Sequence, residues 1–315
     1  MTRIDQFESV FKSADKPVFR YEPFSVGSPM VLTDLDDEAA ESFAGLAGKY
    51  TGAGGSREIS TQRVIKGADF STIEECLELI AVGKPDLICT YRGLHSDCWR
   101  WGQSLGSYVE VLTQTVSVPV LVFPHPAAAE TLSAAIAGCE NPLRSSIGKA
   151  EAFEPRTLPG DHPGEAGCRH VMAMTDHLAG DSRLVNAALF FTPAQGTLHL
   201  TNLEDQQVFE RYMEAIDKIP SIDSAAARDS VLAQILKEAR DYIQSCRTVV
   251  EEQGLDVEIQ ETVELGLHVA DYKRLAAARD VDLLVMNTKD SGQLAMHGLA
   301  YELAVELNDI PLLLL

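Results

Sequence analysis

The sequence predicts an α/β protein made of two tandem, doubly wound domains, each with a five-stranded parallel sheet. Three observations lead to this prediction. An apolar strand led by Asp-Leu occurs twice, in KPDLICTYRG (84–93) and in DVDLLVMNTKD (280–290). Each copy runs into a polar loop, a helical stretch and a Pro-led strand, VPVLVF (118–123) and IPLLLL (310–315). Strands also alternate with helices along most of the chain, which is typical of a parallel sheet covered on both faces.

The second copy, residues 168–315, contains the whole expected series of elements. HVMAMTDH (170–177) is an apolar strand that ends in Thr-Asp-His, TLHLTNLED (197–205) is a second strand, and LDVEIQETVELG (255–266) alternates as a third. Apolar residues at helical spacing between 231 and 246 predict a long helix before that third strand. A further helix, the Asp-Leu strand, a last helix and the Pro-led strand complete the five-stranded unit.

The first copy, residues 1–128, is degenerate at its start, and two interpretations remain open. Either VFKSAD (10–15) is the first strand and SPMVLTDLDD (28–37) the second, or MVLTDLDD is the first strand and a strand-helix unit has been lost. We prefer the former, because the helix and strand that follow (37–67) then fall in the order of the second copy. The helix expected between those strands would be missing or reduced to PVFRYEPF (17–24).

The residues between the copies, 129–167, are rich in Ala, Pro and Gly and predict a linker. Their Pro- and Gly-rich end, 155–167, lacks the apolar periodicity of a helix or strand. The expected domains are therefore 1–128 and 168–315.

Composition excludes several classes of protein. Lys and Arg number 26 against 47 Asp and Glu, for a formal charge of −21, and such an acidic chain lacks the basic surface that nucleic-acid binding requires. No apolar run is long enough to cross a membrane, and the N-terminus has no signal-peptide pattern. The six cysteines show neither zinc-site spacing nor the density of a disulfide scaffold. We therefore expect a cytoplasmic protein.

One segment of the second copy, residues 204–230, adds a helical piece with apolar side chains on one face, namely Phe209, Tyr212, Met213 and Ile216. Such a helix can form a lid over the second cleft or a dimer contact. Most amphipathic helices cover the core of their own domain, and that interpretation is favoured here.

Taken together, these features resemble a tandem universal stress protein. The resemblance rests on Thr175 and Asp176 after a first strand, the Asp-Leu strand with its polar loop, a helix that opens near a Gly-Ser, and the final Pro-led strand. It implies an adenine nucleotide alpha hydrolase-like fold with flavodoxin-like layering, a role in stress responses, and halves that pack as an intramolecular pseudo-dimer, with a homodimer as a further expectation. Some members of the family bind ATP and others do not.

The ATP-binding members carry Gly-x2-Gly-x9-Gly-(Ser/Thr) after the fourth strand, and the first copy keeps this spacing with one change. Gly93, Ser96, Gly106 and Ser107 match the pattern, with Ser96 in place of the second glycine. An alternative register pairs Thr90 with Gly93 and leaves the loop too long. Glycines in such a loop allow positive φ and let backbone N–H groups approach phosphates, so a weakened site is expected here.

The second copy departs further from the pattern. Asn287 and Asp290 stand where the glycine pair would be, and Gly298 is followed by Leu299 instead of a hydroxyl residue. A carboxylate beside a phosphate is unfavourable by about 1 to 4 kcal/mol even with generous screening. No cofactor is certain; an adenine nucleotide such as ATP is the candidate, with its residual site in the first copy.

Two aspartates complete the candidate binding residues. Asp176 corresponds to the family aspartate that borders the nucleotide pocket, and Asp15 is its weaker counterpart under the preferred alignment. An acidic residue after a strand is equally well explained as a helix N-cap or turn former.

Both tryptophans, Trp99 and Trp101, lie in the first-copy loop, close to Arg92, His95 and Arg100. They either form an aromatic wall for an anionic or planar ligand or fill an emptied cleft, and the second interpretation is favoured. Two pairs, His95 with Cys98 and Cys168 with His170, fall short of a metal site because no third ligand is placed by spacing. His177 and His297 form a further candidate pair, yet no nucleophile or paired carboxylate accompanies them.

These observations predict a non-catalytic stress-response or signalling protein that binds a small molecule or a protein partner. The alternative is an enzyme that uses a modified nucleotide site, for slow ATP hydrolysis or nucleotidyl transfer at the first-copy loop.

Overall fold

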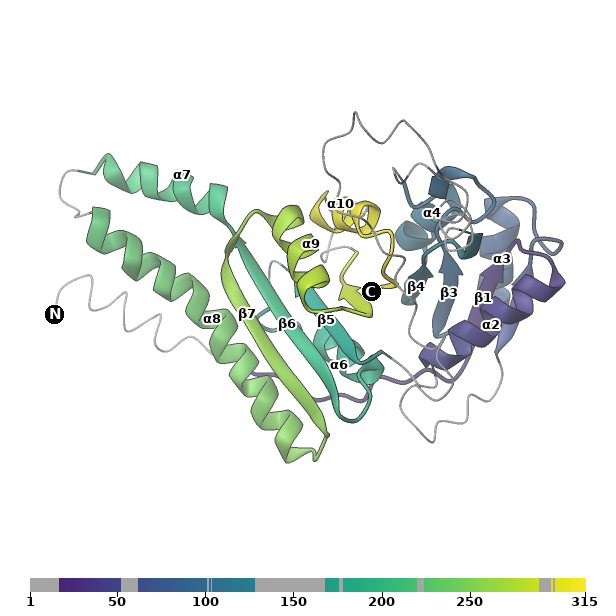
Figure 1. Ribbon diagram of the computed structural model, residues 1–315, viewed down its shortest axis with the longest axis horizontal. Coiled ribbons are helices and arrows are strands. Elements are labelled where there is room, and N and C mark those ends of the chain that lie inside the picture. The colour runs from purple at the N-terminus through teal and green to yellow at the C-terminus, as the bar shows by residue number, and fades with distance from the viewer. Residues whose placement is uncertain are drawn as a thin grey trace, which may run out of the picture.

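The computed structural model describes residues 17–51, 62–100, 102, 104–127, 168–175, 178–219, 224–288, 296 and 298–315. The strands within them form one mixed sheet in the order β2-β1-β3-β4-β9-β8-β5-β6-β7 (Figure 1). The strands are β1 (Pro29–Thr33), β2 (Arg63–Lys66), β3 (Leu87–Tyr91), β4 (Val120–Phe123), β5 (His170–Thr175), β6 (Gly196–Asp205), β7 (Val257–Gly266), β8 (Leu283–Met286) and β9 (Leu312–Leu314). The helices are α2 (Asp37–Thr51), α3 (Ile73–Gly83), the short 3-10 helix η1 (Cys98–Arg100), α4 (Ser107–Thr115), α6 (Ser182–Phe191), α7 (Gln206–Asp217), α8 (Ser224–Glu252), α9 (His268–Ala278) and α10 (Gly298–Glu306).

The strand that starts the first half lies in the middle of its part of the sheet. β1 pairs in parallel with both β2 and β3, and β3 pairs with β4. A doubly wound chain places its first strand centrally, because it winds outward on one side and then on the other. This position favours the interpretation in which MVLTDLDD supplies the first strand, while residues 10–15 lie outside the described residues. Residues 17–24, where the preferred alignment allowed a reduced helix or none, have no regular structure.

The second half follows the predicted series of strands closely. β5 pairs with β6 on one side and with β8 on the other, and β6 pairs with β7 over ten residues. Right-handed crossovers in this order put α6 and α8 on one face and α9 and α10 on the opposite face. The contacts agree, since α6 and α8 meet through Ser182 Oγ and Tyr242 Oη at 3.2 Å. On the other face, Lys273 Nζ of α9 donates to Glu306 of α10 at 2.6 Å.

The two halves share one sheet instead of forming two separate ones, which corrects the prediction of two independent five-stranded sheets. β4 and β9 pair antiparallel, with Val120 opposite Leu314 and Val122 opposite Leu312. Among the described residues the first half contributes four strands and the second half five. An unpaired edge strand exposes open N–H and C=O groups, so pairing two apolar edges satisfies both of them and buries their side chains.

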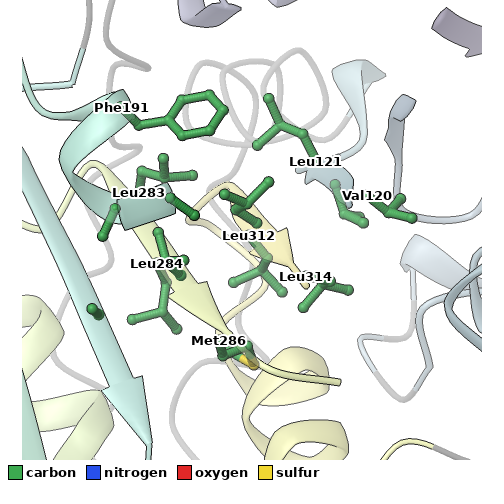
Figure 2. Close-up of a cluster of buried hydrophobic side chains, with 14 of the residues drawn as sticks. Val120, Leu121, Phe191, Leu283, Leu284, Met286, Leu312 and Leu314 are labelled. Atoms are coloured by element: carbon green, nitrogen blue, oxygen red, sulfur yellow. The ribbon is translucent and has the colours of Figure 1, made fainter. Parts of the chain in front are cut away.

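The hydrophobic core continues across this junction (Figure 2). Side chains of β4, β8 and β9 lie together with one aromatic ring of α6, and each is at most 2% exposed: Val120, Leu121, Leu283, Leu284, Met286, Leu312, Leu314 and Phe191. Burial of apolar surface contributes roughly 25 cal/mol per Å², so the shared core stabilises the contact between the halves as well as each half.

Three helices begin with side-chain caps that the sequence encodes locally. Thr72 Oγ1 accepts from the N–H of Glu75 at 3.2 Å, and the Glu75 carboxylate accepts in return from the N–H of Thr72 at 3.2 Å, which is a capping box for α3. Asp181 and Asp205 cap α6 and α7 by simple N-caps, in which the carboxylate accepts from backbone N–H groups of the first turn. These caps fix where the helices begin at the ends of their strands.

Helix α7 and the start of α8 project beyond the sheet (Figure 1). The two helices are joined by Arg228, which donates to Glu210 and lies 5.1 Å from the ring centroid of Phe209. Phe209 and Met213 are buried, but Tyr212 is 63% exposed, so the expected apolar face of this piece is only partly covered. Its role as a lid or dimer contact stays a prediction. None of the described helices, α8 included, combines the length and apolar character that crossing a membrane needs.

Candidate functional site

The loop between β3 and α4 lies at the carboxyl edge of the first half, next to the end of β1. It brings together the predicted residues Gly93, Ser96, Gly106 and Ser107, with Ser107 opening α4. Gly93 has φ 76° and Gly106 has φ 94°, values that favour glycine. The two glycines touch: a Cβ on Gly106 would lie 3.0 Å from Gly93 Cα. The predicted spacing therefore corresponds to a real loop with glycines where the backbone needs them.

Three backbone donors of this loop, including those of both glycines, are already paired within it. The N–H of Gly93 donates to the carbonyl of Leu105 at 2.9 Å, and the N–H of Ser96 donates to the carbonyl of Gly93 at 2.8 Å. The N–H of Gly106 donates to Ser104 Oγ at 2.9 Å. Two of these bonds close short turns inside the loop, so the amides that a phosphate would need are engaged.

Trp99 packs directly onto the first glycine. A Cβ added to Gly93 would lie 2.9 Å from Trp99 Cδ1 and 2.9 Å from the Ser96 carbonyl oxygen. On its other side the indole stacks on His125, with ring centroids 4.3 Å apart and planes at 10°. The Arg100 guanidinium lies 4.7 Å from the Trp99 ring centroid. This geometry is what the cleft-filling interpretation of Trp99 requires, while Trp101 lies outside the described residues.

An aspartate that the sequence interpretation did not select lies beside this loop. Asp34 follows β1 and accepts hydrogen bonds from the Tyr91 hydroxyl and, at 3.0 Å, from the N–H of His95. Tyr91 Oη in turn accepts from the N–H of Asp34 at 2.8 Å and lies 3.0 Å from Thr33 Oγ1. Burial, together with the Asp34 carboxylate, raises the pKa of the Tyr91 hydroxyl. Tyr91 thus ties the ends of β1 and β3 together.

The sequence did contain a signal for Asp34. Thr33 and Asp34 follow β1 as Thr175 and Asp176 follow β5, in the similar stretches MVLTD and VMAMTD. The preferred alignment instead nominated Asp15, which lies outside the described residues, as Asp176 does. β1 pairs with two strands of its half as β5 does in the other half, so Asp34 corresponds in sequence to Asp176.

Further aromatic rings lie around the loop. His95 lies 4.8 Å from the ring centroid of Phe70 and 4.9 Å from that of Tyr108. His125 also contacts Tyr91, with centroids 5.2 Å apart. Burial lowers the pKa of His125 to about 4, so this ring is neutral at pH 7. The described surroundings of the loop are therefore aromatic, with a carboxylate at Asp34.

Arg92 does not serve as a cation for a ligand at this loop. Its guanidinium is 3% exposed and donates to the carbonyl oxygens of Ala304 and, at 2.6 Å, of Leu307, at the C-terminal end of α10. Burial lowers the pKa of Arg92 to about 10, so the group stays charged at pH 7. A cation at this end of a helix interacts favourably with the helix dipole. The side chain of Arg92 crosses to the second half and so adds nothing to the ligand-wall interpretation, which the sequence did not favour.

In the second half, Asn287 is used in a structural contact. It follows β8, and its Nδ2 donates to the carboxylate of Asp181, whose other oxygen accepts from the N–H of Leu184 at 3.0 Å. Gly298 begins α10, and a Cβ added there would meet no atom within 4 Å. Among the described residues, no hydrogen bond joins Asn287 to Gly298. Asp290 and the candidate pair His177 and His297 lie outside the described residues.

In the structure, Cys168 and His170 have separate surroundings. Cys168 is buried, and burial raises the pKa of its thiol, while His170 Nδ1 lies 3.4 Å from His199 Nε2. Arg279 Nη1 lies 3.0 Å from the other nitrogen of His199, and burial beside this cation lowers the pKa of His199 to about 4. In the part of the chain that the structure describes, no three potential ligands meet in a metal site.

Comparisons with known proteins leave the family unassigned. No family model and no curated protein matches the sequence. Three solved structures are similar over most of the chain. A functionally unknown protein from Pseudomonas aeruginosa PAO1 is 15% identical, covers 92% of each chain and has a TM-score of 0.46. A protein from Pseudomonas aeruginosa UCBPP-PA14, provisionally described as a universal stress protein, is 15% identical, covers 92% of this chain and 93% of its own, and has a TM-score of 0.47.

The third is a universal stress protein from Archaeoglobus fulgidus DSM 4304, which is 13% identical, covers 93% of this chain and 97% of its own, and has a TM-score of 0.44. Each TM-score is below 0.5. These likenesses concern the general layout of a large, mostly parallel α/β sheet and assign no function.

Proposed function

We propose that this chain is a non-catalytic protein of the universal stress type, with two related halves packed as a pseudo-dimer, that acts by binding a small molecule or a protein partner. In this proposal, nucleoside triphosphate binding is weakened at the first-half loop and lost in the second half. The contact of Trp99 with Gly93 carries the proposal.

The first-half loop supports the proposal through the state of its donors. Phosphate binding by a glycine loop depends on free backbone N–H groups and on the absence of side chains over the glycines. Here the amides of Gly93, Ser96 and Gly106 donate within the loop, and the Trp99 indole covers Gly93. A triphosphate would have to break these bonds and displace a stacked ring, which lowers its affinity.

Charge supports the proposal at both edges. Asp34 lies beside the first loop, and Asp181 lies beside Asn287 in the second half. A carboxylate about 4 Å from a phosphate oxygen costs about 1 kcal/mol in bulk water and about 4 kcal/mol at the effective dielectric of a protein surface. Arg92, the buried cation closest in sequence to the loop, is held by α10. Arg100, the exposed cation of the first loop, is already paired with Asp97, with 3.1 Å between Arg100 Nε and Asp97 Oδ1.

The rival function is slow ATP hydrolysis or nucleotidyl transfer at the first loop. It needs a group that holds the phosphates and a base that activates the nucleophile. Two described groups near the loop suit that role poorly, because burial raises the pKa of the Tyr91 hydroxyl and lowers the pKa of His125 to about 4, which makes this imidazole, stacked on Trp99, a weak base.

Calorimetric titration of the full chain with ATP, ADP and AMP, with and without Mg²⁺, tests the proposal. We expect no saturable binding of ATP below about 100 μM. The variant Gly106→Asp, with Gly254→Asp as a control, reports where any weaker binding occurs. Gly254 also has a positive φ, 66°, but lies at the end of α8 with no atom near its added Cβ. Tight ATP binding that Gly106→Asp abolishes and Gly254→Asp preserves would show that the first loop is a working nucleotide site and that the proposal is wrong.

A further inference from the structure

The N-terminal segment of the described chain, residues 17–28, crosses from the first half to the second and is called the strap here. In Figure 1 it is the purple segment that passes α6 toward α8. Its backbone is held by side chains of these two helices: the N–H of Phe19 donates to Ser245 Oγ (2.9 Å), that of Arg20 to Ser182 Oγ (3.2 Å) and that of Glu22 to Asn186 Oδ1 (3.1 Å). The strap is thus an extended chain bound to a surface that the second half provides.

A cavity of about 200 Å³ lies between the strap and the second half. Tyr21 and Phe24 of the strap form one wall, and Asn186 and Phe190 of α6 form another. Asp256, just before β7, lies at the same cavity. These residues lie near the amino ends of β6 and β7, so the cavity is at the sheet edge opposite to the one at which Asn287 and Asp181 meet.

The cavity combines aromatic rings with a carboxylate. Phe24 and Phe190 pack edge to face, with centroids 5.2 Å apart. Among the described residues that line the cavity, Asp256 alone carries a charge, and no described residue forms a salt bridge with it. Asn186 is 6% exposed and is fixed by the strap, since its Nδ2 donates to the Arg20 carbonyl at 2.9 Å.

Such a lining selects a cation with an apolar body. Aromatic rings attract ammonium groups as well as apolar surface, and a carboxylate adds an ion pair. The formal charge of −21 also raises the local concentration of cations. A carboxylate ligand would instead meet Asp256 with no described cation in the lining to offset it.

We propose that this cavity binds a small primary ammonium ion with an apolar or aromatic body. A water molecule takes up about 30 Å³ of liquid volume, so the cavity suits a ligand of roughly six to nine heavy atoms. The ammonium group pairs with Asp256, and the body lies against Tyr21, Phe24 and Phe190. Because the strap supplies one wall, binding also holds the strap against α6. This site goes beyond the proposed function and does not depend on whether the loops bind nucleotide.

Calorimetric titration of the full chain with benzylammonium tests the site, with benzyl alcohol as a neutral compound of the same size. We expect saturable binding of benzylammonium, at one per chain, with at least tenfold weaker binding of benzyl alcohol. Asp256→Asn should weaken benzylammonium binding at least tenfold. Glu214→Gln, which neutralises an exposed carboxylate on α7, is the matched control and should leave it unchanged. Both substituted residues are exposed, so neither variant is expected to unfold.

Two further measurements locate the binding. Ala194, an exposed residue that lines the cavity, can be replaced by Phe to fill it, and Ala194→Phe should abolish binding. Hydrogen exchange of the strap amides that donate to α6 and α8 should slow several-fold when benzylammonium binds. No saturable binding up to about 10 mM, equal affinity for benzyl alcohol, full binding by Asp256→Asn or Ala194→Phe, or unchanged strap exchange would each overturn the proposal.

Discussion

Replacing Arg92, a buried residue, by Met should destabilise the protein by about 2 kcal/mol. The substitution leaves the carbonyl oxygens of Ala304 and Leu307 without their charged donor. Each buried acceptor that loses its partner costs about 1 to 3 kcal/mol, and loss of a cation at a helix C-terminus costs about 0.3 to 2 kcal/mol. Against this, burial lowers the pKa of Arg92 from 12.5 to about 10, so removing the charge recovers about 3 kcal/mol of desolvation. The lost contacts outweigh the recovered desolvation, but by a modest margin.

Urea unfolding followed by tryptophan fluorescence and by far-UV circular dichroism measures this difference. Trp99 lies in the loop that begins at Arg92, so its fluorescence reports the local contact, while circular dichroism reports the whole fold. Arg211→Met is the control, because Arg211 is exposed on α7, and it should change the free energy of unfolding by less than about 0.5 kcal/mol. If Arg92→Met is as stable as the wild type by both signals, the bonds to α10 contribute nothing net and the reasoning fails.

Three other predictions concern different parts of the fold. Phe19→Ala should cost about 3 to 5 kcal/mol in thermal or urea unfolding, because this ring is 2% exposed against Tyr242, whereas Val18→Ala, at a 59% exposed site, should cost almost nothing. The folded-state pKa of His199 is about 4, against an ordinary value of 6.5, so its contribution to stability is complete above pH 6.5 and is lost as the pH falls toward 4. The free energy of unfolding of His199→Gln, measured across this range, should therefore decline less steeply than that of the wild type. An identical decline would contradict the assignment. Thr72→Ala should cost about 0.5 to 2 kcal/mol by removing the capping box of α3, and an unchanged melting temperature would show that the cap is not needed.

The second half was predictable from sequence because its signals are local. Alternation in 255–266 and the apolar strand after Asp282 appear in the structure as β7 and β8, each bounded within two residues of the expected ends. The Gly-x2-Ser-x9-Gly-Ser spacing likewise predicted a loop in which Gly93 and Gly106 adopt positive φ. Patterns of this kind depend on neighbouring residues along the chain, and a single sequence records them well.

Contacts between distant segments could not be predicted in this way. Arg92 entered the less favoured ligand-wall interpretation because of its sequence neighbours, yet its guanidinium contacts a carbonyl 212 residues further on. Two other contacts leave no periodic signal in either partner. One is the pairing of β4 with β9, and the other is the strap contact between Phe19 and Ser245, which are 226 residues apart. Asp34 was missed for another reason: the choice of first strand depends on the position of β1 in the sheet, which only the pairing with both β2 and β3 reveals.

Because β4 pairs with β9, part of the sheet can form only late in synthesis on the ribosome. The apolar edge of β4 is complete early in synthesis, whereas its partner consists of residues 312–314. Chains grow at roughly 5 to 20 residues per second, so the edge of β4 stays unpaired for about 10 to 40 seconds before β9 is made. The strap waits even longer for its last contact, because Ser245 lies 226 residues after Phe19. During that interval the nascent first half presents an open apolar strand, which is the kind of surface that chaperones bind and that neighbouring chains pair with.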